Sequence, residues 1–147
     1  MLYSENMMRH YYFAYGMNTN PEEMARRCSD SKALGRADLE GYRFVFRGHA
    51  DVELADPDEY VEGVLWEVSN DDLYQLDWLE GFPDYYLRQR VKVQFEGEEY
   101  IAWVYTMQDQ SFKSGPSETY YNMCKTGYEY FGVDTDQIQE ALGYVRA

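Results

Sequence analysis

Cysteine, histidine and basic residues are scarce in this sequence. Its 147 residues include two cysteines, two histidines and 13 lysines and arginines, against 27 aspartates and glutamates. Cys28 and Cys124 are far apart and each falls in a helical pattern, so we expect buried, reduced thiols rather than a disulfide. His10 and His49 are isolated from cysteine, which gives no basis for a zinc or iron site. Glycine signatures of the Rossmann or P-loop kind are also missing, so an enzyme built on this chain is expected to need no metal or cofactor.

The excess of acidic residues limits the range of partners. The formal net charge is −14, and no cluster of lysine or arginine stands out. Nucleic acids and anionic membranes bind through a basic footprint, so we expect neither as a partner. No run of 18 apolar residues predicts a transmembrane helix. Residues 1–10 lack the apolar core and cleavage site of a signal peptide, which favours a cytoplasmic protein.

Aromatic residues are abundant and indicate a packed core. Hydrophobic residues make up 45% of the chain, with 16 tyrosines and 7 phenylalanines, which argues against disorder. Residues 1–9 are polar and irregular and predict a flexible tail. Residues 10–147 contain no repeat and no long linker, so they are expected to form a single domain.

The periodicity of the chain predicts a mixed fold. Alternating or aromatic-rich runs predict about six strands, at residues 10–15, 41–47, 50–54, 60–68, 87–95 and 99–107. Helical patterns begin near residues 21, 69, 117 and 134. Because most strands follow one another as hairpins, we expect an α+β fold. Its sheet is mostly antiparallel and curled into a small barrel, with three to four flanking helices.

The segment 69–88 organises the prediction of function. Ser69 and Asp72 form the pattern of a capping box, and Gly81 followed by Pro83 is typical of a helix end. Leu73 and Leu76 define an inward stripe whose continuation places Glu80 where an apolar residue would be expected.

A carboxylate at such a position is suited to proton transfer. Removal from water disfavours its charged form and raises its pKa from about 4.3 towards the range useful for acid–base catalysis. Gly81 leaves room for a ligand to approach. The alternative is that Glu80 is simply the exposed last turn of a helix.

A glycine turn in the first part of the chain is a second candidate site. Gly16 separates the predicted strand 10–15 from a helix that begins with Asn20 and Pro21. Such a turn presents several backbone N–H groups in one direction and can bind a carboxylate or a developing oxyanion. An ordinary strand–helix connection would have the same pattern.

Three motifs occur in order along the chain. They are Tyr12-Phe-Ala-Tyr-Gly-Met-Asn18, then Gly63-Val-Leu-Trp66, then Leu76-Asp-Trp-Leu-Glu-Gly81 with Tyr86-Leu-Arg88. Together they resemble the gamma-glutamylcyclotransferase-like family over residues 11 to about 142. This resemblance implies a barrel-centred α+β fold and release of 5-oxoproline from gamma-glutamyl compounds, with Glu80 as the acid/base. The residues it implies in substrate binding are Tyr12, Phe13, Ala14, Tyr15, Gly16, Met17, Asn18 and Tyr120.

The resemblance leaves the substrate open. Relatives act on gamma-glutamyl amino acids, glutathione, gamma-glutamylamines or larger amides. Many members have serine where this chain has Met17, a change that matters only if a hydroxyl is needed there. Tyr120 also fits an aromatic core position. Arg88 is a candidate for pairing with a substrate carboxylate, or for a structural ion pair with acidic neighbours such as Asp77.

The predicted chemistry needs few protein groups. The substrate's own α-amine attacks its γ-carbonyl, so one carboxylate and a set of oxyanion donors suffice. The expected partner is a small gamma-glutamyl molecule, and the expected state is a monomer or weak homodimer. Two other hypotheses are a non-catalytic module that binds a gamma-glutamyl compound or similar zwitterion, and an acidic protein that acts through its surface. A binder would gain nothing from an unpaired buried carboxylate, which favours the enzyme.

Overall fold

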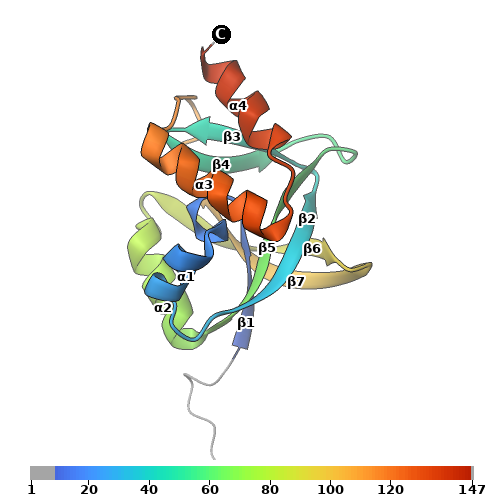
Figure 1. Ribbon diagram of the computed structural model, residues 1–147, viewed down its shortest axis with the longest axis vertical. Helices are drawn as coiled ribbons and strands as arrows, with labels where there is room; N and C mark the ends of the chain where they lie inside the picture. Colours follow the sequence, from blue (N-terminus) through green and yellow to red (C-terminus); the bar gives the residue numbers. More distant parts are fainter. Residues whose placement is uncertain (1–8, 147) are drawn as a thin grey trace, which may run out of the picture.

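A closed five-stranded β-barrel forms the centre of the molecule (Figure 1). The computed structural model describes residues 9–146. The strands of this part of the chain are β1 (Arg9–Ala14), β2 (Lys32–Glu40), β3 (Tyr42–Arg47), β4 (His49–Leu54), β5 (Tyr60–Ser69), β6 (Tyr86–Phe95) and β7 (Glu98–Met107). The helices are η2 (Met17–Thr19, 3₁₀), α1 (Pro21–Arg27), α2 (Asn70–Glu80), α3 (Glu118–Phe131) and α4 (Asp136–Arg146).

The barrel order is β1-β5-β2-β6-β7, and β3 and β4 form a separate two-stranded sheet. All strand pairs are antiparallel except β1 with β7, which closes the barrel in parallel where Tyr12 lies opposite Trp103. The α+β prediction with a mostly antiparallel barrel and flanking helices is confirmed. None of the helices in residues 9–146 is long and apolar enough to cross a membrane.

Strand β2 was missed by the sequence analysis, which predicted six strands where the described chain has seven. Its pattern is obscured because only Ala37 and Leu39 are buried. A register shift between Ala33 and Gly35 also interrupts the alternation. Arg36 instead pairs with Glu62 on the outside of the barrel. The predicted tail 1–9 was one residue too long, since Arg9 belongs to β1; residues 1–8 lie outside the described part.

Helix α2 begins and ends as its sequence predicts. The Ser69 hydroxyl accepts a hydrogen bond from the Asp72 N–H at 3.1 Å, and the Asp72 carboxylate accepts one from the Ser69 N–H at 3.2 Å. Gly81 ends the helix in the left-handed conformation, with φ of 68°. This cap fixes the rotation of α2, and therefore the side of the helix on which Glu80 lies.

A buried ion pair within the sheet of β3 and β4 also links this sheet to the barrel. Arg47 and Asp51 are almost fully buried, and the Arg47 Nε lies 2.8 Å from Asp51 Oδ2. The second Asp51 oxygen accepts a hydrogen bond from the N–H of Met107 in β7. This link holds the start of β4, His49 and Ala50, beside the end of the barrel.

Helix α3 lies directly against the 3₁₀ turn η2. A Cβ added at Gly127 would lie 2.3 Å from Thr19 Oγ1 and 2.5 Å from the Thr19 carbonyl carbon, so no larger residue fits without displacing the turn. Cys124, one turn earlier in α3, and Cys28 after α1 are both buried, as expected, and each is a free cysteine in the structure. Burial raises the pKa of each thiol to about 12.

Candidate active site

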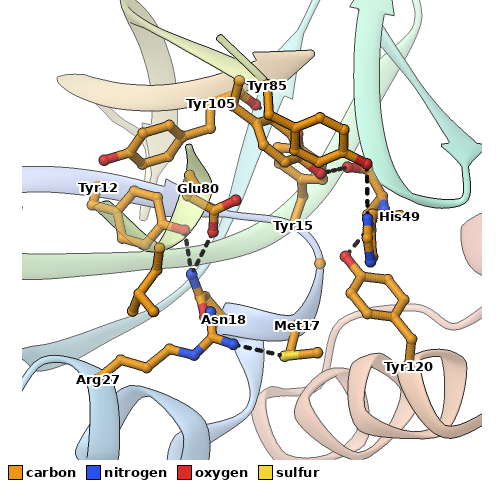
Figure 2. Close-up of a pocket in the computed structure, with 14 residues that line it drawn as sticks. Tyr12, Tyr15, Met17, Asn18, Arg27, His49, Glu80, Tyr85, Tyr105 and Tyr120 are labelled. Carbon is orange, nitrogen blue, oxygen red and sulfur yellow. Dashed lines mark hydrogen bonds between the residues drawn. The ribbon is translucent and has the colours of Figure 1, made fainter. Parts of the chain in front are cut away.

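A cavity of about 150 Å³ opens where β1, α2 and the β6–β7 hairpin meet η2, β4 and α3 (Figure 2). The residues that line it come from all parts of the chain and are mostly aromatic. They are Tyr12, Tyr15, Gly16, Met17, Asn18, Arg27, His49, Ala50, Leu79, Glu80, Tyr85, Tyr86, Tyr105 and Tyr120. Among these lining residues, Glu80 is the only acidic side chain, and the basic ones are Arg27 and the imidazole of His49.

Glu80 projects from the last turn of α2 into this cavity rather than into solvent. It continues the stripe of Leu73 and Leu76, both of which are buried. Its Oε1 accepts a hydrogen bond from the Asn18 side-chain amide at 3.3 Å. Burial raises the pKa of Glu80 to about 7, while the positive charge of Arg27 and the bond from Asn18 act in the opposite direction. The carboxyl group is therefore able both to accept and to donate a proton near neutral pH.

The glycine turn forms the floor opposite Glu80. Thr19 holds the turn, because its N–H and its hydroxyl both donate to the Gly16 carbonyl, at 3.1 and 2.7 Å. A Cβ at Gly16 would lie 2.8 Å from the Ala50 Cβ and 3.0 Å from the Tyr120 hydroxyl, so the close approach of these segments requires glycine. The first N–H groups of a helix have no partner within it, and at the start of η2 the backbone of Met17 hydrogen-bonds to the Tyr120 hydroxyl, so that donors of this turn face the cavity.

Hydrogen-bonded tyrosines make the walls of the cavity rigid. Tyr15 donates to the Tyr105 carbonyl at 2.6 Å, Tyr86 donates to the Ala50 carbonyl at 2.7 Å, and the Ala50 N–H donates to the Tyr120 hydroxyl at 3.0 Å. Burial raises the pKa of each of these phenols above its ordinary value. They are therefore neutral near pH 7, and they shape the cavity without adding charge.

The residues that line the cavity all lie within the stretch of the chain that a family model matches. Residues 12–123 match the family model described as gamma-glutamyl cyclotransferase, AIG2-like. The chain belongs to this family. A solved structure titled "Gamma-glutamyl cyclotransferase" is 25% identical, with a TM-score of 0.81, and covers 94% of this chain and 88% of its own. The solved structure of an uncharacterized human protein is 26% identical, with a TM-score of 0.80. The match covers 93% of this chain and 88% of the human protein's chain.

Two curated relatives match shorter stretches. A candidate gamma-glutamylcyclotransferase of Drosophila melanogaster is 33% identical over 97 residues, which is 62% of each chain. One of Methanocaldococcus jannaschii is 40% identical over 47 residues, or 31% of this chain. The matched parts thus span 62% and 39% of these relatives' own lengths.

Seven of the ten residues predicted from the sequence and the family resemblance meet in the cavity. They are Tyr12, Tyr15, Gly16, Met17, Asn18, Glu80 and Tyr120. Phe13 and Ala14 are buried in the barrel core and do not line it. Arg88 also lies outside: its Nε is 2.8 Å from Asp77 Oδ1, and its guanidinium stacks on Trp103. The structure thus places Arg88 in the ion pair that was the alternative interpretation.

The sequence analysis missed several lining residues of this family member. Arg27 was not among the predicted site residues, although it lines the cavity and donates to Asn18. His49 was considered as a possible metal ligand and was not among the predicted site residues. It packs against the Tyr120 ring with 4.9 Å between centroids, and its Nδ1 lies 2.9 Å from the Tyr85 hydroxyl. Burial lowers the pKa of His49, so a neutral imidazole stands at the cavity wall. No local motif marks these residues, because their partners in the cavity lie 9 to 71 positions away, beyond the reach of capping patterns and helical periodicity.

Proposed function

We propose that this protein is a cofactor-independent gamma-glutamyl cyclotransferase. It converts a gamma-glutamyl amino acid or amide into 5-oxoproline and a free amine. The observation that carries the proposal is a single carboxyl group, Glu80, with a pKa of about 7, facing a glycine turn across a small cavity. Membership of the gamma-glutamyl cyclotransferase family supports the same general activity.

Glu80 has the proton-transfer role in this reaction. Its carboxylate takes a proton from the substrate's α-ammonium group, and the free amine attacks the γ-carbonyl carbon to form the new lactam C–N bond. Glu80-H returns the proton to the leaving nitrogen as the tetrahedral intermediate collapses and the original amide C–N bond breaks. The attacking nitrogen, which is positively charged after the attack, gives its second proton to the regenerated Glu80 carboxylate, which passes it to the released amine, so that 5-oxoproline, an ammonium product and ionised Glu80 result. One group with a pKa near 7 serves as base and then as acid, and no protein nucleophile is required.

The turn and the walls supply the rest of the catalysis. N–H groups at the start of η2 are the donors that we assign to the oxyanion, a role typically worth about 3 kcal/mol per donor. The tyrosine walls hold the γ-glutamyl chain bent, so that the amine lies close to the carbonyl carbon before reaction. Because a backbone N–H does not depend on its side chain, Met17 in place of serine is compatible with this role.

The proposal is tested by mass-spectrometric detection of 5-oxoproline. The protein is incubated with gamma-glutamyl amino acids, glutathione, gamma-glutamyl-lysine and simple gamma-glutamylamines. Formation of 5-oxoproline with one class identifies the leaving group and establishes the reaction. Thermal stabilisation by these compounds without product would instead support the binding module, and neither effect with any compound would overturn both.

The rate is expected to depend on pH through Glu80. The base form must be present in the free enzyme, so kcat/KM should rise about tenfold per pH unit below the Glu80 pKa and level off above about pH 7. Initial rates measured from pH 5 to 8.5 with the best substrate provide the profile. A kcat/KM that is flat over this range would show that no group of this pKa controls the reaction.

A further inference from the structure

Arg27, at the end of α1, is held by three contacts that point it towards the cavity. Its Nε donates to Glu23 Oε2 at 3.2 Å, one turn earlier in the helix. Its Nη1 donates to Asn18 Oδ1 at 3.2 Å, and its Nη2 to the Met17 sulfur at 3.3 Å. Helix α1 is itself fixed at its start, where the Asn20 side chain caps the N–H groups of Glu22 and Glu23. The guanidinium is thus positioned by its own helix and not by the substrate.

Arg27 determines which way the Asn18 amide faces. A guanidinium carries only donors, so it must meet the carbonyl oxygen of the amide. The NH₂ group then faces the other side, where it donates to Glu80 Oε1 at 3.3 Å and to the Tyr12 hydroxyl at 3.0 Å (Figure 2). The reverse orientation would place donor against donor at Arg27 and oxygen against carboxylate at Glu80. Asn18 is 4% exposed, so water does not readily replace these partners.

We propose that Arg27 is a positioning residue for Glu80: through Asn18 it holds the carboxyl group in one orientation, and its charge favours the ionised base. This proposal rests on the proposed function of Glu80 and adds a cavity-lining residue whose hydrogen bonds go to Glu23, Asn18 and Met17 rather than to Glu80 itself. Removal of Arg27 should therefore change how readily Glu80 ionises more than it changes substrate affinity.

The surroundings of Glu80 contain no substitute for this charge within residues 9–146. The other titratable groups near Glu80 lie in or directly next to β1, α1, β4, β6, β7 and α3. They are Tyr12, Tyr15, Cys28, His49, Tyr85, Tyr86, Tyr105 and Tyr120. The phenols and the thiol are neutral because burial raises the pKa of each, and burial lowers the pKa of His49. On α2 itself, Asp77 is occupied by Arg88 and by the Tyr105 hydroxyl. Arg27 is the cation that opposes the effect of burial on Glu80.

The test compares two neighbouring arginines of α1. Arg27→Gln should move the Glu80 titration, and with it the acidic limb of kcat/KM, upward by about one pH unit, with a fall in kcat larger than the change in KM. Arg26→Gln is the matched control: Arg26 also pairs with Glu23, but its side chain is 70% exposed and makes no contact with Asn18. It removes the same charge from the same helix and should leave the titration in place.

The Glu80 titration is followed by ¹³C NMR of glutamate carboxyl groups, with the Glu80 signal assigned from its absence in Glu80→Gln. This readout needs no turnover, so loss of the proposed function and loss of the positioning role are distinguished. Arg27→Lys keeps the positive charge but loses the planar guanidinium that bonds to Asn18. It should shift the Glu80 titration less than Arg27→Gln does, while still lowering kcat. This variant also provides the test if Arg27→Gln does not fold. An unchanged Glu80 titration in both Arg27 variants, or an equal shift in Arg26→Gln, would overturn the proposal.

Discussion

Replacement of Glu80 by glutamine is expected to lower kcat/KM for 5-oxoproline formation by about 10³-fold or more, because one group provides both proton transfers and each contributes 10²–10⁴-fold in typical enzymes. Glutamine keeps the shape of the side chain and can still bond to Asn18, so the cavity should be preserved. The rate is measured by product formation under conditions of low substrate. The exposed Glu129→Gln on α3 is the matched control and should retain the parental rate.

The same substitution should not destabilise the protein. The folded-state pKa of Glu80, about 7, lies above its ordinary value of 4.5, so the folded protein binds more protons between these values. The free energy of unfolding of the unsubstituted protein therefore falls as pH rises through this window, and below about pH 4.5 Glu80 causes no such loss. Glutamine cannot ionise, so at pH 8 the variant should gain up to about 3 kcal/mol in its free energy of unfolding, with no gain at pH 4.

The outcome that contradicts the catalytic prediction is a folded Glu80→Gln variant with full activity, which would exclude Glu80 as the acid/base.

Replacement of Gly127 by alanine is expected to destabilise the protein and to disturb the active site together. The new methyl group would overlap Thr19, whose backbone continues directly from Asn18. Overpacking of this kind typically costs about 1–3 kcal/mol, which outweighs the gain of about 1 kcal/mol from a better helix former. Thermal unfolding should show a lower midpoint, and kcat/KM should fall because η2 is displaced.

Gly143 in α4 provides the matched control for this substitution. A Cβ at Gly143 would meet no atom within 4 Å, so alanine there adds helix propensity without overlap. Gly143→Ala should therefore raise stability by about 0.5–1 kcal/mol and leave activity unchanged. If both alanine variants are stabilised and active, the tight contact between α3 and η2 does not constrain the site.

The local features of the site were predictable because each depends on neighbours in the sequence. The cap at Ser69 and the left-handed Gly81 define α2, and the apolar stripe then places Glu80 on its inner face. Gly16, Asn20 and Pro21 likewise define the turn and the start of α1. The barrel followed from hairpin order and alternation. Strand β2 was missed because only Ala37 and Leu39 are buried, a register shift interrupts its alternation, and Arg36 pairs with Glu62 of the neighbouring strand β5 on the outside of the barrel.

The sequence by itself determined the helix ends, the glycine turn, most strands and the acidic group at the end of α2, because capping and periodicity act over three or four residues. Only the tertiary structure decided which side chains surround that group. Arg27 donates to Asn18, and His49 contacts Tyr85 and Tyr120. Arg88 forms an ion pair with Asp77 outside the cavity. These contacts depend on how the helices and β4 pack around the barrel, because the paired residues lie between 9 and 71 positions apart in the sequence.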